Sequence, residues 1–232
     1  MKLHKRLLIN GDEFLPINDN SVLDLFTPGR AVYTVKSAVK LSGSVVLDFG
    51  YSLDKMKTFF VGYIETSTSV DSNQQRIFCR EISAKLNTVL PLNLRAPTYP
   101  DVLKSLSKQT GLFFSFADNE HSNKKTPVFY SCNTGYHSLD SIGKVFEIPK
   151  YIWQQQGDGK IFSGSWNDSY FSNKPLTIPP NYQQKVGISG RASIAAFPGL
   201  RPGAMINGEY LTGVTLIDHS MNLTWNKDPW KK

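Results

Sequence analysis

Two segments rich in β-forming residues, each opened by an element that contains Phe, Pro and Gly, lie on either side of a shorter insert. The first element spans residues 26–30 (Phe-Thr-Pro-Gly-Arg) and the second spans residues 197–203 (Phe-Pro-Gly-Leu-Arg-Pro-Gly). Proline and glycine supply the φ values that tight turns between short strands require. The sequence therefore predicts a mainly β (α+β) chain, in which two small β-barrel-like modules flank a compact α+β insert with two helices. The expected domain boundaries are 1–92, 93–170 and 171–232, the last including a C-terminal tail.

Strand patterns dominate the first segment. Runs rich in β-branched and aromatic residues, bounded by Gly or by Asn, Asp and Ser clusters, cover residues 31–35, 45–49, 58–65 and 76–82. Gly62, in the middle of the third run, indicates a bulge or a close approach of another backbone. Four or more short antiparallel strands in this arrangement favour a small barrel or a strongly twisted sheet.

Helix signals mark the insert. Thr98, followed three residues later by Asp101, matches a capping pattern, and Gly111 is placed to end the helix that begins there. A second helix is expected at about 136–146, because its apolar residues recur at helical spacing and Pro149 follows.

The rest of the chain is predicted to be strands and connections. A hairpin is expected from 151–166, around a Gly-Asp-Gly turn. Residues 117–126 are typical of a polar loop and residues 167–180 of a linker. Three further strands are expected in the second β segment, at 186–194, 209–217 and 221–225.

The charge of the chain is positive but dispersed. The net charge of +7 comes from 26 basic and 19 acidic residues, and the basic residues form no run of five or more. Nucleic-acid binding normally requires clustered positive charge, so a solvated basic surface is the better interpretation and no nucleic-acid partner is expected.

The sequence predicts no disulfide framework, no signal peptide and no membrane span. Cys79 and Cys132 lie far apart and have no zinc-ligand spacing, so neither a disulfide framework nor a metal site is predicted. Cys79 belongs to an apolar run, where a small buried thiol is expected. The first nine residues are too short in apolar sequence for a signal peptide, and no run is long enough to span a membrane. A soluble protein made in the cytosol is therefore expected.

No group of residues predicts catalysis. The Gly-Asp-Gly-Lys sequence at 157–160 lacks the spacing of a phosphate-binding loop and opens a strand, so a hairpin turn is expected. The four histidines are isolated along the chain. Sequence alone leaves open a pair of carboxylates brought together by the fold. Trp153 and Trp166, at the ends of the expected hairpin, would suit glycan stacking, although core packing explains them more simply. The prediction is no enzyme activity, no cofactor and no metal.

Several motifs resemble those of phage baseplate hub proteins. The pair Phe-Val-Gly-Tyr-Ile-Glu at 60–65 and Arg-Ile-Phe-Cys-Arg-Glu at 76–81 is similar to a strand pair of the late-control D proteins and of the 43-kDa-type tail proteins of Mu-like phages. The insert, at 98–111 and 136–166, and the Arg-Pro-Gly to Met-x-Leu-x-Trp segment at 201–225 also resemble phage tail sequences. The resemblance extends over most of residues 45–225.

This resemblance implies a homotrimer in which two similar barrels per chain alternate to form a six-membered ring. Such a ring would join the sixfold tail tube, or a distal tail protein, to a trimeric central spike. The implied location is the tail or baseplate of a virion assembled in the cytoplasm of the bacterial host. This chain is shorter than the usual hub, and its two β segments are unequal in length. The second barrel would therefore close within one chain, or with strands from a neighbouring copy or from residues 1–25.

The leading hypothesis is therefore a structural hub of a phage or prophage tail baseplate. The alternatives are a glycan- or cell-wall-binding or -degrading module of a tail tip, and a related spike-base protein of a contractile secretion system. The residues expected at interfaces between modules or subunits come from the two Phe-Pro-Gly elements and the rim of the first module: Phe26, Pro28, Gly29, Arg30, Arg80, Glu81, Arg201, Pro202 and Gly203.

Overall fold

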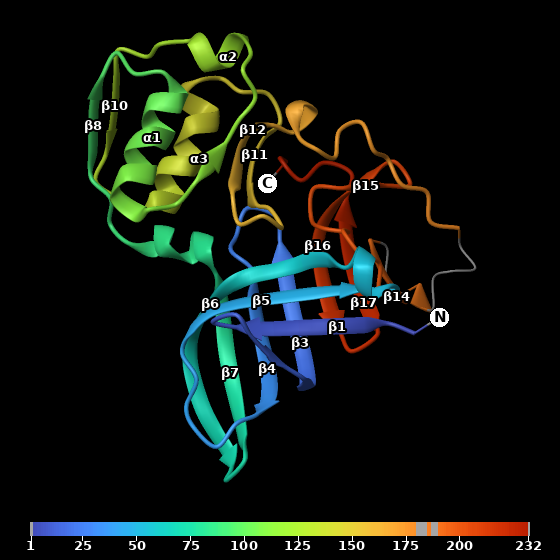
Figure 1. Ribbon diagram of the computed structural model, residues 1–232. Helices are drawn as coiled ribbons and strands as arrows, with labels where there is room; N and C mark the ends of the chain where they lie inside the picture. The colour runs from blue at the N-terminus through green and yellow to red at the C-terminus, as the bar shows by residue number, and fades with distance from the viewer. Residues whose placement is uncertain (1, 180–184, 187–189, 232) are drawn as a thin grey trace. The chain divides into compact units, whose positions relative to one another are not determined.

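The computed structural model describes residues 2–179, 185–186 and 190–231, and the chain divides into two compact units (Figure 1). The β unit contains Met1–Ile82 and Lys174–Lys232, and the insert unit contains Ser83–Asn173. Most of both predicted β segments belongs to the β unit, whereas residues 83–92 and 171–173 belong to the insert unit. All α-helices in the described residues belong to the insert unit. The predicted fold class, mainly β with an α+β insert, is confirmed. The domain limits predicted at residues 92 and 170 stay predictions, and the limits of the two compact units lie at Ile82 and Asn173.

One sheet of 12 strands runs through the β unit. Its hydrogen-bonded order is β13-β14-β17-β16-β3-β4-β7-β6-β5-β1-β2, and β15 pairs with β16 outside this path. A single 3-10 turn, Leu53–Lys55, separates β5 from β6. The strands are β1 His4–Ile9, β2 Asp12–Phe14, β3 Pro16–Asp24, β4 Arg30–Lys36, β5 Gly43–Gly50, β6 Lys57–Asp71, β7 Gln74–Glu81, β13 Lys185–Val186, β14 Arg191–Ala195, β15 Met205–Ile206, β16 Glu209–Ile217 and β17 Ser220–Asn226.

The two β segments meet where β16 pairs with β3. The pairing is antiparallel and runs in register from Gly213 opposite Asp24 to Ile217 opposite Asn20. Strands from both predicted modules are therefore hydrogen bonded into one sheet. The expected strands at 209–217 and 221–225 correspond to β16 and β17. Of the strand expected at 186–194, residues 187–189 lie outside the described residues, and its end corresponds to β14.

β2 and β3 form one bent run with only Leu15 between them. β2 pairs with β1 and β3 pairs with β4, so this run links the two ends of the series β1-β5-β6-β7-β4. Lys5 Nζ lies 2.6 Å from Asp19 Oδ2 and connects β1 to β3 directly. This path agrees with a barrel-like module, and closure of the barrel stays a prediction.

The sequence patterns predict no strand in residues 4–24, although β1, β2 and β3 lie there. For β3 the cause is its inward face, whose buried positions are Asp19, Ser21 and Leu23. Two of these three residues are polar, so the apolar alternation that identifies a half-buried strand is missing. Their burial is possible because Lys5 binds Asp19 and because the hydroxyl oxygens of Ser21 and Tyr33 lie 2.8 Å apart.

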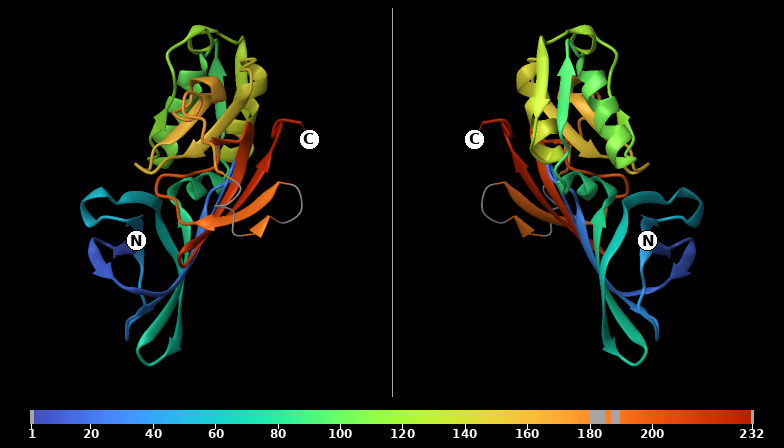
Figure 2. Two further views of the ribbon diagram at one scale, coloured as in Figure 1. Left: turned by 90° about the vertical axis from the view of Figure 1, so that its right-hand side faces the viewer. Right: turned by 90° about the vertical axis from the view of Figure 1, so that its left-hand side faces the viewer.

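Gly62 marks a close approach of two backbones, as predicted. A Cβ at this position would lie 2.0 Å from the carbonyl oxygen of Arg80 in β7, a distance that no side chain can occupy. Beyond Ile64, β6 continues without β5 and pairs only with β7. The two strands therefore project as a long hairpin past the end of β5 (Figure 2). The core of the β unit contains these fully buried residues: Leu7, Tyr33, Leu47, Phe60, Ile77 and Cys79.

The insert unit packs two helices against short strands. Strands β8 and β10 pair as a ribbon, and β11, β12 and β9 form a second small sheet. The hairpin predicted at 151–166 is confirmed as β11 and β12. The elements are 3-10 helix η2 Ile82–Asn87, β8 Leu92–Arg95, α1 Tyr99–Thr110, β9 Phe114–Ser115, α2 Glu120–Asn123, β10 Val128–Ser131, α3 Gly135–Val145, β11 Tyr151–Gln155, β12 Ile161–Ser165 and 3-10 helix η3 Trp166–Asp168.

Helix α1 begins and ends where the sequence predicts. Thr98 accepts a hydrogen bond from the backbone N–H of Asp101, the Asp101 carboxylate accepts one in return, and Gly111 is left-handed at φ 71°. The second predicted helix is α3. The loop predicted at 117–126 contains the one-turn helix α2, because the side chain of Asn119 caps it by accepting from His121 and Ser122.

No helix in the described part of the chain combines the length and the apolar character that a membrane crossing demands.

The two cysteines should differ sharply in reactivity. Cys79 is fully buried in β7, and this burial raises the pKa of its thiol to about 12, whereas Cys132 is exposed. Because the thiolate is the reactive form, a chromogenic disulfide reagent at neutral pH should modify one thiol in the folded protein and the second only after denaturation. The Cys132→Ser variant should show no fast reaction. Rapid labelling of Cys79 in folded protein would contradict the burial described here.

Candidate functional site at a buried Glu81–Arg201 joint

The two Phe-Pro-Gly elements form corners of the β unit. Residues 26–30 connect β3 to β4, and residues 197–203 connect β14 to β15. Phe26 has φ 66°, an uncommon conformation for a residue with a side chain, and Gly199 and Gly203 have φ 84° and 92°. Next to the first corner, the Leu25 N–H donates to the Thr212 carbonyl oxygen at 2.8 Å.

Glu81 binds the first corner. This residue ends β7 and is 3% exposed. Its Oε2 accepts a hydrogen bond of 2.7 Å from the Gly29 N–H, and its own N–H donates to the Gly29 carbonyl oxygen at 2.9 Å. The same glutamate is thus held to one glycine through both its side chain and its backbone.

Arg201 binds the same glutamate from the second corner. Its Nη2 lies 2.9 Å from Glu81 Oε1, and its Nη1 donates to the Phe59 carbonyl oxygen in β6. Arg201 is only 6% exposed, so both charges of the pair are buried. A nearby bond, from the Tyr51 hydroxyl to the Ala196 carbonyl oxygen at 2.8 Å, also connects the first β segment to the second.

The Glu81 carboxylate of this Glu81–Arg201 joint is buried away from water, which disfavours its charged form. Burial raises the pKa of Glu81, while the charge of Arg201 and the Gly29 N–H act in the opposite direction. An isolated buried carboxylate is very costly, so the joint depends on its cation and its N–H donor being present together.

The space around residue 29 leaves no room for a side chain. A Cβ at this position would lie 2.5 Å from Leu23 Cδ2 and 2.9 Å from Glu81 Cδ. Any side chain would displace the carboxylate from the hydrogen bond that it accepts. The first element therefore contains glycine because another part of the chain approaches it closely.

The structure brings three of the predicted interface residues into one cluster, namely Gly29, Glu81 and Arg201. Arg30 and Arg80 are register partners on β4 and β7, and Arg30 also lies 3.1 Å from the Asp24 carboxylate at the surface. Four others belong to the corners without entering the cluster: Phe26 and Pro28 are half-buried, and Pro202 and Gly203 are buried. A role for any of these nine residues at a subunit contact stays a prediction.

The sequence contains a signal for this cluster that the prediction of a charged barrel rim did not use. Gln75, Ile77, Cys79 and Glu81 alternate along β7 and all face inward, with exposures of 3% or less. A glutamate at an inward position of a strand demands a buried cation. No local sequence pattern identifies Arg201 as that cation, and none indicates that the Phe59 carbonyl takes part.

Trp153 and Trp166 are buried, as the core-packing interpretation predicted. They are 1% and 5% exposed. The Trp153 indole N–H donates to Asp140 Oδ1 at 2.8 Å, and its ring stacks on Tyr136 with the ring centroids 5.7 Å apart. Neither indole presents a face on which a sugar ring would stack.

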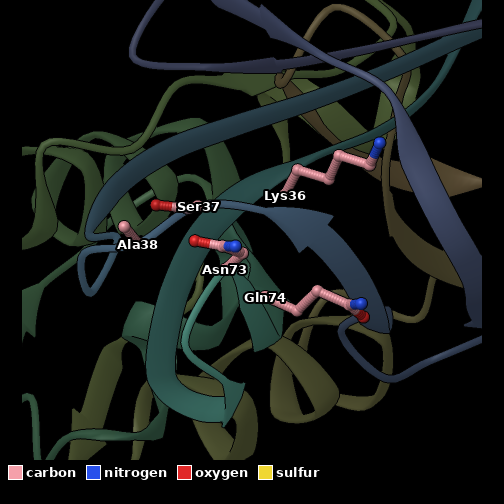
Figure 3. A pocket seen from close by; sticks show the side chains of 5 residues that line it. All are labelled: Lys36, Ser37, Ala38, Asn73 and Gln74. Carbon is pink, nitrogen blue, oxygen red and sulfur yellow. The ribbon is translucent and has the colours of Figure 1, made fainter.

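The described residues contain no group of three or more His, Cys, Asp or Glu side chains arranged to hold a metal ion. A pocket of about 420 Å³ lies at the tip of the β6–β7 hairpin (Figure 3). Lys36 and Gln74 extend away from Ser37 and Ala38 there, so the lining side chains do not converge on one point.

Comparison with known proteins identifies the fold. No family model matches the chain. An uncharacterized 58.7 kDa protein in the lys 3' region of Haemophilus phage HP1 is 29% identical over 217 residues; these cover 93% of this chain, which spans only 40% of that relative.

Three solved structures share the fold. The 43 kDa tail protein of prophage MuSo2 from Shewanella oneidensis superposes with a TM-score of 0.74 at 7% identity, covering 98% of this chain and 99% of the other. A tail protein from Neisseria meningitidis MC58 gives a TM-score of 0.70 at 11% identity, covering 98% and 97%. The E. coli c3393 protein, a component of the type VI secretion system described as similar to the T4 tail proteins gp27 and gp5, gives 0.59 at 11% identity, covering 97% and 76%. The chain has the fold of phage and prophage tail proteins.

Loss of one charge from the joint should be far more damaging than loss of a surface charge. Arg201→Met leaves the Glu81 carboxylate buried without its cation, so the free energy of unfolding should fall by about 3–5 kcal/mol. Arg30→Ala, which removes the exposed pair with Asp24, should cost less than about 1 kcal/mol. Urea denaturation monitored by tryptophan fluorescence measures both.

The double variant Glu81→Met/Arg201→Met should be more stable than Arg201→Met alone, since no charge is then left unpaired. A wild-type denaturation midpoint for Arg201→Met would show that the joint contributes nothing to the fold.

Proposed function

We propose that this chain is a structural hub of a phage or prophage tail baseplate. Three copies form a ring with pseudo-sixfold symmetry that joins the tail tube to a central spike. The observation that carries the proposal is the superposition on the MuSo2 tail protein, which extends over nearly the whole of both chains. The hub-like motifs at 60–65 and 76–81 lie in β6 and β7.

The geometry of the β unit supports this role. Three copies of a chain present six modules only if each chain holds two modules in a fixed relation. The β3–β16 pairing and the Glu81–Arg201 joint connect the two β segments in this way. In this proposal the bent run of β2 and β3 closes the first segment as a barrel, while the shorter second segment completes the ring beside a neighbouring copy.

The proposal includes no catalysis and no cofactor. The protein contributes surfaces, and its partners are further copies of itself, a tail-tube or distal tail protein, and the central spike. Its place is the virion tail, after synthesis in the bacterial cytoplasm. A cell-wall-degrading or glycan-binding tail tip is the alternative of a different class, and the burial of both hairpin tryptophans weighs against its binding form.

One observation favours a second candidate of the same class, a spike-base protein of a contractile secretion system. The E. coli c3393 protein is a component of such a system and superposes on 97% of this chain, although at a lower TM-score than the two tail proteins. The genes that surround this one would separate a phage tail from a secretion system.

The mass of the purified protein in solution tests the ring. Light scattering during size-exclusion chromatography should give about three times the chain mass of 26.0 kDa, because obligate rings bury large interfaces on each protomer. A single chain mass that persists as the concentration is raised into the range of about 100 μM would contradict the proposed ring.

A peptidoglycan assay tests the absence of catalysis. Purified protein should release no soluble fragments from bacterial cell walls, with a lysozyme sample as the positive control. Release of fragments that is abolished by substituting one exposed Asp or Glu would replace the hub proposal with the cell-wall-degrading alternative.

A further inference from the structure

The ribbon formed by β8 and β10 carries apolar side chains on both of its faces. The antiparallel ladder extends beyond these strands, from a bridge between Val89 and Thr134 to a bridge between Thr98 and Lys125. Its inner face buries Leu92 and Phe129 at 4% and 3% exposure. Antiparallel strands with one buried face normally carry polar residues on the other.

The outer face of the ribbon departs from that rule. Val89, Val128 and Tyr130 are 65%, 52% and 68% exposed. Val128 and Tyr130 lie two residues apart in β10, with the exposed Asn93 opposite Tyr130, and Val89 lies on the same face beyond Pro91 and Cys132. Arg95 stands opposite Val128 on the same face. We call Val89, Arg95, Val128 and Tyr130 the ribbon patch. Exposed apolar clusters that contain Tyr and Arg are typical of protein–protein contacts.

The single charge of the ribbon patch has no partner of opposite sign. Arg95 is exposed and forms no ion pair with any described residue. The ribbon patch is therefore complementary to a surface that combines exposed apolar side chains with one anion.

The bend between β2 and β3 offers such a surface. Leu15 is 82% exposed and Ile17 is 42% exposed, and Glu13 is exposed two residues before Leu15. We call these three residues the corner patch. Glu13 forms no ion pair with any described residue, although its charge acts on Arg6. β2 is also the last strand of the hydrogen-bonded order, so no strand among the described residues pairs with its outer backbone edge.

We propose that the ribbon patch of one copy of this chain binds the corner patch of a second copy. Arg95 would pair with Glu13 of the neighbour, while the exposed aliphatic side chains pack against Val128 and Tyr130. Two different patches make the contact head-to-tail, which is the kind of contact that closes rings of more than two copies. This inference rests on the proposed function, and it adds the surface that would connect neighbouring hub subunits.

A charge-reversal cycle tests the contact. Sedimentation velocity over a concentration series gives the dissociation constant of self-association for the wild type and for Arg95→Glu, Glu13→Arg and the double variant. Each single reversal places like charges together, so each dissociation constant should rise about tenfold or more. The double variant restores opposite charges and should return to within about threefold of the wild type. Tyr130→Ala should weaken association by about tenfold or more.

Lys104→Glu is the matched control, because it makes the same change of charge on the exposed side of α1, outside both patches. It should leave association unchanged. Thermal unfolding of every variant separates a lost contact from a lost fold, and all should retain the wild-type melting temperature.

The outcomes distinguish this contact from the ring itself. A trimer that persists unchanged in Arg95→Glu and Tyr130→Ala overturns the contact and leaves the proposed hub standing. If Arg95→Glu and Glu13→Arg each weaken association and the double variant does not recover it, the pairing of Arg95 with Glu13 is overturned. Association in numbers other than three that still depends on both charges supports the contact and contradicts the trimer. Binding of only a different tail protein by the ribbon patch overturns the inference.

Discussion

Glu81 occupies an inward position of β7, and the arrangement of the β unit follows from what that buried carboxylate requires. A strand that alternates Ile77, Cys79 and Glu81 on its inner face places a charge where water cannot solvate it. The chain supplies the Gly29 N–H from 52 residues before and the Arg201 guanidinium from 120 residues after. Both donors come from the Phe-Pro-Gly corners, so a single ionised side chain sets the distance between two corners that are remote in sequence.

This constraint explains how the insert is accommodated. The insert unit begins at Ser83, two residues after Glu81, and the chain re-enters the β unit at Lys174. The strands on either side of this excursion belong to one sheet through the β3–β16 pairing. A compact unit with its own capped helices and its own core is therefore added without interrupting a ladder, which is the usual condition for tolerating an insertion.

The features of this protein that suit assembly lie at its surface. The buried ion pairs, Glu81 with Arg201 and Asp19 with Lys5, hold strands together. The exposed features are strand edges, the β6–β7 hairpin and the ribbon patch on the β8–β10 ribbon. These are the features through which β proteins associate, and they agree with a tail protein whose proposed work is assembly.

Local patterns in the sequence determined several features whose cause lies within a few residues. Thr98, Asp101 and Gly111 set the limits of α1, the Gly-Asp-Gly turn set the β11–β12 hairpin, and the apolar run around Cys79 set its burial. Only the tertiary structure decided the strand character of residues 4–24, the merging of both β segments into one sheet, and the partner of Glu81. In the sequence, the buried polar residues Asp19, Ser21 and Glu81 look like surface residues. Their hydrogen-bond partners come from distant parts of the chain. Such long-range compensation leaves no periodic signal in sequence, because the free energy that selects it is gained only when the distant segments meet.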